Sequence, residues 1–237
     1  MIAKAPGKLV VSGAYSVLEG APAIVVAVDR YAVADTSRAP DRVTDEVRAA
    51  IEAHMMRTAP WFDASALRAT LPDGRDVKLG LGSSAAILVA SMAAAWAIED
   101  RTLDPRALFQ ASLAAHRTAQ GGGSGIDVAA SVFGGALACR LADPSRGGTR
   151  RPAPPHAGSS ASSAASERSA SVPEESPPAS RDLGLSLSPH VLPDGTLIEA
   201  FASPVSASTP DLVGRVRAFA GRSPEEHARL LEEASRR

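Results

Sequence analysis

Short runs of aliphatic residues, broken by glycine and proline, occupy the N-terminal part of the chain. Residues 9–11, 23–28 and 31–34 are such runs. Glycine and proline separate the first two runs, and the Asp-Arg pair at 29–30 favours a turn before the third. The pattern predicts three short β-strands joined by turns.

The spacing of apolar residues then changes to that of helices. Residues 41–57 carry an apolar side chain at every fourth position (Val43, Val47, Ile51 and Met55), which predicts an amphipathic helix. Residues 83–99 begin at a serine pair and are apolar on nearly every side, so we expect a buried helix there. Residues 105–119 predict another helix, with Asp104 as its N-cap and Pro105 in its first turn.

Turn residues and a change of composition divide the rest of the chain. A Pro-Asp-Gly sequence at 72–74 predicts a turn, and residues 136–141 predict a strand. From 143 to 181 the chain is dominated by serine, alanine and proline. Such a segment cannot bury enough apolar surface to offset the entropy lost on ordering, so we expect disorder. A hairpin at 192–197 and helices that begin near 209 and 223 are expected to follow.

The composition is that of a soluble globular protein. Of the 237 residues, 45% are hydrophobic and 22% are charged, and the formal net charge is -1. A nearly neutral chain has no basic field to attract nucleic acid or an anionic membrane, so neither is an expected partner. An anionic substrate must therefore be held by a local site.

The N-terminal segment does not resemble a signal peptide, and the single cysteine excludes an intramolecular disulfide. Lys4 and Lys8, with a proline and a glycine between them, interrupt the apolar stretch that a signal peptide needs, so the expected location is the cytoplasm. Cys139 has no second cysteine with which to form a disulfide. Its apolar neighbours favour a buried structural thiol over a nucleophile.

A glycine-rich loop that leads into the buried helix is a candidate phosphate site. Its residues are Gly80, Leu81, Gly82, Ser83, Ser84 and Ala85. Glycine lets the backbone approach a bulky anion, and a helix N-terminus supplies unpaired N–H groups with a partial positive charge. A serine in the first turn can also ligate a Mg²⁺ that bridges phosphates. The alternative is a tight turn with a serine cap, and the spacing fits neither a Walker A loop nor a dinucleotide-binding fingerprint.

Two further segments place a charged residue close to glycine. Lys8 follows Pro6-Gly7, and Asp127 follows the glycine-rich loop at 121–125. A carboxylate beside a lysine stays ionised and can accept a proton from, or orient, a substrate oxygen that attacks a γ-phosphate. Each residue also has a simpler interpretation, because Lys8 can be a solvated strand lysine and Asp127 a helix cap.

The three segments together, in this order, resemble the GHMP kinases, a superfamily named for galactokinase and for homoserine, mevalonate and phosphomevalonate kinases. The sequence from Pro6 to Gly13 resembles the first motif of the family, and Gly80-Leu81-Gly82-Ser83-Ser84-Ala85-Ala86 resembles its ATP phosphate loop. The resemblance covers residues 1–141 and 190–237. It implies an α/β fold of the two-layer α+β kind: an ATP-binding domain like domain 2 of ribosomal protein S5 over 1–142, a linker over 143–182, and the start of a ferredoxin-like domain over 183–237.

Within the superfamily, the motifs are most similar to those of phosphomevalonate kinases. The stretch from His116 through Gln120-Gly121 to Ser124-Gly125-Ile126-Asp127 fits that pattern, as do residues 13–19 and 206–213. Mevalonate kinases usually have Glu-His where this chain has Ala14-Tyr15, and a metal-binding glutamate where it has His116. The resemblance implies transfer of a phosphoryl group from ATP, with Mg²⁺, to (R)-5-phosphomevalonate in the mevalonate route to isoprenoids, by a monomer or homodimer.

The resemblance also implies roles for single residues. Lys8 would pair with the reacting phosphates and with Asp127, the catalytic carboxylate. The loop residues 80–85 would bind ATP, with Ser84 as the best Mg²⁺ ligand. Contacts to the substrate would come from four residues (Tyr15, Ser124, Gly125 and Ser208).

One departure from the family leaves alternatives open. The third glycine-rich motif of the family does not occur before Arg237. We therefore expect either a piece of a longer chain or a natural truncation, and a poor catalyst in either case. The alternatives are mevalonate kinase or another small-molecule GHMP kinase, and a truncated chain that binds nucleotide without catalysis.

Overall fold

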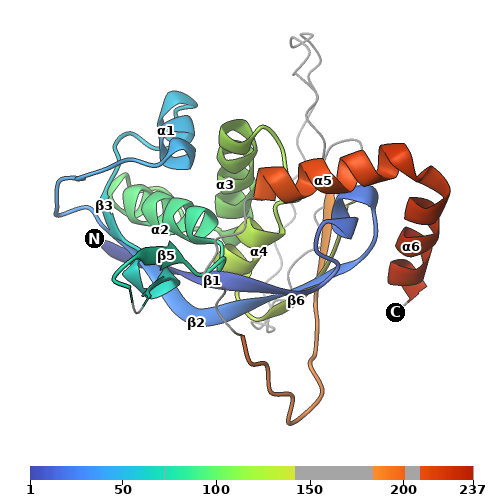
Figure 1. The fold of residues 1–237 in the computed structure, drawn as a ribbon. Helices are drawn as coiled ribbons and strands as arrows, with labels where there is room; N and C mark the ends of the chain where they lie inside the picture. The colour runs from blue at the N-terminus through green and yellow to red at the C-terminus, as the bar shows by residue number, and fades with distance from the viewer. Residues whose placement is uncertain (72, 142–183, 201–208, 237) are drawn as a thin grey trace, which may run out of the picture.

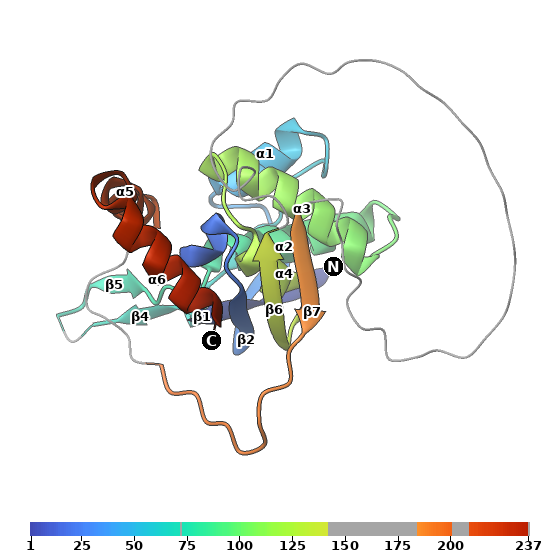
Figure 2. The same ribbon diagram turned by 90° about the vertical axis from the view of Figure 1, so that its right-hand side faces the viewer.

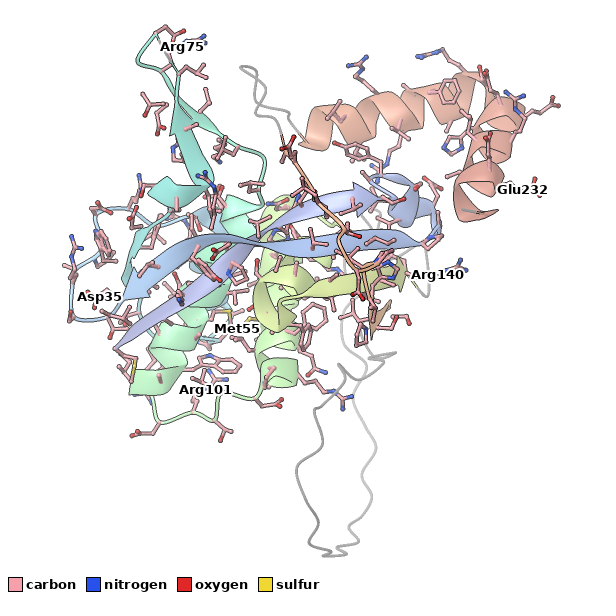
Figure 3. The ribbon with its side chains drawn as sticks, turned by 90° about the horizontal axis from the view of Figure 1, so that it is seen from below. Asp35, Met55, Arg75, Arg101, Arg140 and Glu232 are labelled. Atoms are coloured by element: carbon pink, nitrogen blue, oxygen red, sulfur yellow. The ribbon has the colours of Figure 1, made fainter. Side chains whose placement is uncertain are left out.

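A computed structural model describes residues 1–71, 73–141, 184–200 and 209–236. The expected disordered segment at 143–181 and the expected substrate residue Ser208 lie outside these ranges. The described part is a mixed α/β structure in which an antiparallel sheet is covered by helices (Figure 1). Seen from below, the green helices lie behind the two long blue strands (Figure 3).

Two long strands make up one side of the main sheet, with the more N-terminal of the two at its edge. Strands β1 (Ile2–Ser12) and β2 (Ala23–Asp35) pair along most of their length. The far edge of β2 pairs with β6 (Ala136–Leu141) and, at its other end, with β3 (Trp61–Asp63). Strand β7 (Leu185–Pro189) adds to β6, and all these pairs are antiparallel (Figure 2). The predicted strands at 9–11, 23–28, 31–34 and 136–141 are thereby confirmed.

The turn predicted at 29–30 is wrong, because β2 continues through these residues. Pro6 pairs with Tyr31 and Lys8 pairs with Ala27, so residues 28–30 lie opposite Gly7 alone. Such a bulge lets exposed polar residues leave the ladder without ending the strand. It lies beside Lys8, at the point where β1 approaches the glycine-rich loop.

Helices α2 (Ser83–Ile98) and α4 (Ile126–Phe133) pack on the sheet. Helix α3 (Pro105–Gln120) packs on both of them, and α1 (Asp45–Glu52) packs on α2 and α3. The predicted N-cap is confirmed, since the Asp104 side chain accepts a hydrogen bond from Ala107 N at 2.7 Å. Helix α1 is shorter than the predicted 41–57. It begins after Thr44, whose side chain caps it, and the chain turns away at His54, which has a φ of 56°.

Helix α2 forms the centre of the core, as its apolar sequence predicts. Its side chains from Ala85 to Met92 are all buried, and the helix packs on β1, β2, α3 and α4. Alanine at many of its positions allows these close approaches. Cys139 on β6 is 2% exposed, and burial raises the pKa of its thiol to about 12, so the predicted structural role is confirmed.

A small hairpin stands apart from the main sheet. Strands β4 (Arg68–Thr70) and β5 (Asp76–Lys78) pair, and Gly74 N donates to Leu71 O at 2.9 Å, which confirms the predicted turn. Arg75 lies at its tip (Figure 3). Short 3₁₀ helices, η1 (Ser16–Glu19) and η2 (Ser65–Leu67), complete the N-terminal part.

The C-terminal residues differ in part from expectation. The hairpin predicted at 192–197 is wrong: Thr196 N donates to Pro193 O at 3.1 Å in a turn, but β7 is the only strand within residues 184–200. The predicted helices are confirmed as α5 (Thr209–Arg222) and α6 (Pro224–Arg236). Strand β7 lies beyond the predicted domain boundary and still pairs with β6; the domain division itself stays a prediction. In the four ranges described, no helix is long and apolar enough to cross a membrane.

Candidate functional site

Strand β1 carries Lys8 to the glycine-rich loop that precedes α2. Lys8 N donates to Leu81 O at 2.9 Å, which extends the strand pairing onto the loop. The Lys8 ammonium group also donates to Gly80 O, at a longer distance of 3.4 Å. A Cβ at Gly7 would stand 2.7 Å from Leu81 O, so only glycine permits this approach of the two backbones. The first two predicted motifs therefore meet in space.

Helix α2 begins next to the contact between Lys8 and the glycine-rich loop. Gly82 is the N-cap, with a φ of 69° in the left-handed region, and no side chain caps the helix. The first intrahelical bond runs from Ala86 N to Gly82 O at 3.1 Å. The N–H groups of residues 83–85 therefore have no acceptor within the helix. The Lys8 side chain passes beside Gly82, the residue that precedes them. Unpaired N–H groups, the helix dipole and a lysine form a suitable site for a phosphate group.

The fit of a magnesium ion rests on one hydroxyl group. Ser84 lies in the first turn of α2 and is half-buried. Across the part of the chain that the structure describes, no cluster of three or more His, Cys, Asp or Glu side chains could hold a metal. Mg²⁺ commonly keeps several waters and binds through a few protein oxygens together with substrate phosphates. Ser84 fits that kind of site and does not fit an all-protein cage.

A second glycine-rich loop, residues 121–125, connects α3 to α4. Helix α3 ends at Gly121, with a φ of 67°, and α4 begins after Gly125, with a φ of 81°. Arg117, in the last turn of α3, donates from Nε to Gly123 O at 3.3 Å and from Nη2 to Ser124 O at 3.5 Å. These contacts hold the loop, and with it the predicted substrate residues Ser124 and Gly125, against α3.

Asp127 lies in the first turn of α4, where the helix dipole favours a negative charge. Its Oδ1 accepts a hydrogen bond from Val128 N at 3.0 Å, and its Oδ2 lies 3.3 Å from Nε2 of His116. The expected pair of Lys8 with Asp127 is not formed within the described residues. The structure places His116 beside the carboxylate and Lys8 on the phosphate loop.

Helix α4 is nevertheless tied to β1 next to Lys8. Ser131 Oγ donates to Pro6 O at 2.9 Å. Asp127 and Ser131 are four residues apart and so lie on the same face of α4. Asp127 is thus one helical turn from a contact to Pro6, and Pro6 is two residues from Lys8. The structure brings together Lys8, the phosphate loop and the Asp127 segment, which are far apart in the sequence.

A buried acidic residue beside this site was missed by sequence reasoning. Glu46 on α1 is 6% exposed, and Gln120 Nε2 donates to its Oε1 at 3.0 Å. Burial raises the pKa of Glu46, but the hydrogen bonds from Gln120, from its own backbone and from Thr44, with the charge of His116, lower it below its usual value. No local signal marks Glu46, because its burial arises from the packing of α1 on α3.

Tyr15 has an unusual backbone conformation. Its φ is 62° and its ψ is −42°, and Ser16 N donates to Ala14 O at 2.7 Å. This is a γ-turn with positive φ, which is rare and strained. The turn follows β1 directly and precedes η1. Its role as a substrate contact stays a prediction, and Ser208 lies outside the described residues.

Comparisons with known proteins show which sequences and folds this chain resembles. Residues 46–135 match the family model for the GHMP kinases N terminal domain. The chain is 32% identical over 150 residues to a mevalonate kinase of Archaeoglobus fulgidus, which covers 57% of this chain and 51% of that protein. It is 32% identical over 189 residues to a phosphomevalonate kinase of a Streptomyces species, which covers 60% of this chain and 50% of that protein.

The fold also has solved counterparts. A crystal structure of the Lin0012 protein from Listeria innocua superposes with a TM-score of 0.60 at 19% identity, over 99% of this chain and 69% of that one. These findings confirm the resemblance inferred from the motifs, because residues 46–135 match the model of the GHMP kinases N terminal domain. The curated relatives include both a mevalonate kinase and a phosphomevalonate kinase, and the chain spans about half the length of each.

Proposed function

We propose that the protein transfers the γ-phosphoryl group of ATP to the phosphate of (R)-5-phosphomevalonate, giving the 5-diphosphate. The observation that carries this proposal is the contact of Lys8 with the phosphate loop. The ammonium group lies at Gly80 O, and the side chain passes over Gly82 at the uncapped N-terminus of α2. A lysine and a helix N-terminus at one point provide the fixed positive potential that a triphosphate requires.

In this proposal the loop and Lys8 hold the ATP phosphates. The backbone N–H groups of residues 83–85 bind phosphate oxygens, and the Lys8 ammonium group leaves Gly80 O for the stronger acceptor. The Ser84 hydroxyl would hold a Mg²⁺, which would offset part of the phosphate charge. Transfer then depends on alignment and on charge stabilisation that is already in place when the substrates bind.

Asp127 acts on the acceptor side of the reaction. A phosphate monoester is ionised at neutral pH, so its oxygen needs little deprotonation before it attacks. The carboxylate then serves to orient the acceptor through Ser124 and Gly125, which precede it, more than to act as a strong base. Contact with His116 suits this role, because the imidazole limits the rotation of the carboxylate.

Two observations bear on the choice of acceptor. The similarity to a phosphomevalonate kinase covers 60% of the chain, and His116 stands where the resemblance gives mevalonate kinases a metal-binding glutamate. Mevalonate kinase is the second candidate, because a mevalonate kinase is equally similar over 57% of the chain. Its acceptor is an alcohol, for which a base at Asp127 matters more.

The test is the rate of ADP formation with ATP, Mg²⁺ and each of four acceptors: phosphomevalonate, mevalonate, galactose and homoserine. We expect the highest kcat/KM with phosphomevalonate. Asp127→Asn provides the background rate of ATP hydrolysis by the same preparation. A higher kcat/KM with mevalonate would favour the second candidate, and a wild-type rate no higher than that of Asp127→Asn with every acceptor would contradict both.

A further inference from the structure

A buried imidazole lies beside Asp127, and packing does not explain it. His116 is 3% exposed, and among the described residues neither of its ring nitrogens makes a hydrogen bond of good geometry. Its Nε2 lies 3.3 Å from Asp127 Oδ2. A buried polar group without a hydrogen bond costs about 1–3 kcal/mol. An apolar residue would avoid this cost, so the imidazole calls for a functional reason.

The position of His116 is fixed by contacts that do not involve Asp127. One turn further along α3, Gln120 is hydrogen-bonded to the buried Glu46 of α1. The next residue, Arg117, is hydrogen-bonded to the backbone of the loop at Gly123 and Ser124. The end of α3 is therefore anchored on both sides, and the imidazole presents a fixed nitrogen to a carboxylate that sits on a different helix.

The charges around the imidazole make Asp127 its natural partner. Helix α2, which packs on α3, carries no charged residue, and Asp127 is the only charged residue of α4. On α1 the buried charge is Glu46, whose lowered pKa includes a contribution from His116. Two carboxylates, those of Glu46 and Asp127, therefore act on His116, and of these two only Asp127 is within 4 Å of its ring nitrogens.

We propose that His116 is a positioning residue for Asp127: its Nε2 holds Oδ2 and so fixes the carboxylate toward the acceptor. This inference rests on the proposed function, because it assumes that Asp127 acts on the acceptor. The contact at 3.3 Å is loose, as catalytic hydrogen bonds often are before substrates bind, and it shortens in the complex. His116 itself touches neither ATP nor the acceptor.

Two substitutions separate positioning from packing. His116→Leu fills the buried space without a donor, and His116→Gln restores an N–H group near the place of Nε2. We expect His116→Leu to lower kcat by roughly 10- to 100-fold with an unchanged KM for ATP, since small misplacements of catalytic groups cost this much. We expect His116→Gln to recover most of the rate. Ser112→Ala is the matched control, because Ser112 is also buried on α3 and is bonded to Met92 and not to Asp127.

A spectroscopic readout tests the contact without any turnover. The ¹⁵N resonances of the His116 ring are identified by their absence in His116→Gln, and they should shift when Asp127 is replaced by Asn. They should not shift in Ser112→Ala. If the wild-type protein phosphorylates none of the acceptors, the proposed function fails while this shift still establishes the contact. Ring resonances unmoved by Asp127→Asn, or a kcat for His116→Leu equal to that of Ser112→Ala, would overturn the inference.

Discussion

The Lys8 side chain lies directly across Gly82: a Cβ at Gly82 would stand 2.9 Å from Lys8 Cγ and 3.0 Å from its Cε. The glycine therefore has two functions. It adopts a φ of 69° at the start of α2, and it leaves room for the lysine to reach the phosphate loop. Any side chain at this position must displace Lys8 or the loop.

Gly82→Ala should consequently weaken ATP binding more than it weakens the fold. We expect the Kd for ATP to rise by about 10-fold or more, which corresponds to about 1.4 kcal/mol, as measured by calorimetric titration. Gly74→Ala is the matched control, because Gly74 has a φ of +80° and no atom within 4 Å of an added Cβ. Both variants place alanine at a positive φ, so equal affinities for ATP would show that the Lys8 contact has no part in binding.

Lys8→Ala should lower kcat by about 10²–10³-fold, the usual effect of removing one preorganised charge from a transition state. The physical reason is the position of its ammonium group at the loop, 3.4 Å from Gly80 O. Lys4→Ala serves for comparison, since Lys4 lies on the same strand with its ammonium group 4.7 Å from the centre of the Tyr31 ring. The steady-state rate of ADP formation by each variant tests this prediction. Near-normal turnover of Lys8→Ala would show that Lys8 is a surface lysine without a catalytic role.

Gly125→Ala should destabilise the fold. An added Cβ would stand 2.2 Å from Cδ1 of Leu113, which is fully buried and has no space to move into, and the φ of Gly125 is +81°. We expect a loss of about 2–4 kcal/mol in the free energy of unfolding, from overpacking together with backbone strain. Gly135 has a φ of +60° and no atom within 4 Å of an added Cβ, so Gly135→Ala shows the effect of backbone strain without overpacking. Urea denaturation of both variants should give a clearly larger loss for Gly125→Ala.

Glu46 should make stability depend on pH in the acidic range. Its pKa in the folded protein is below the usual 4.5, so its ionised form stabilises the fold above that pH, and this stabilisation is lost as the pH falls through the folded pKa. At neutral pH we expect Glu46→Gln to be less stable than wild type, with the difference shrinking as the solution is acidified below 4.5. Glu52→Gln, on the exposed side of the same helix, should show no such convergence. A difference that stays constant with pH would mean that the Glu46 charge is not involved.

Local signals sufficed to predict much of the fold. The cap at Asp104, the buried helix α2 and the glycine turn before it each depend on a few residues, and the structure confirms all three. The phosphate-binding role of the glycine-rich loop stays a prediction. The bulge in β2 was misread as a turn, because Asp29 and Arg30 favour a turn locally and the pairing with β1 overrides that preference. The pairing of β7 with β6 joins segments that are distant in sequence, and no local pattern encodes it.

The candidate site was also predicted only in part. Lys8, the loop at 80–85 and Asp127 were selected from the sequence because each belongs to a short motif. Their geometry was only partly foreseen, since Lys8 contacts the loop while Asp127 faces His116. The partners of the carboxylate depend on how α1, α3 and α4 pack together, which is a tertiary property. Glu46 was missed for the same reason.

The most direct measurement is ³¹P NMR of the protein with ATP, Mg²⁺ and (R)-5-phosphomevalonate. Transfer to a phosphate oxygen converts the monoester resonance into two coupled resonances of a diphosphate, and the γ-phosphate signal of ATP disappears in equal amount as ADP forms. We predict this conversion, and we predict that it slows by about 10²–10³-fold in Lys8→Ala and that it is also slower in Asp127→Asn. A monoester resonance that persists while ATP stays intact, or while ATP is hydrolysed to ADP and inorganic phosphate, would contradict the assignment of this site to phosphoryl transfer onto phosphomevalonate.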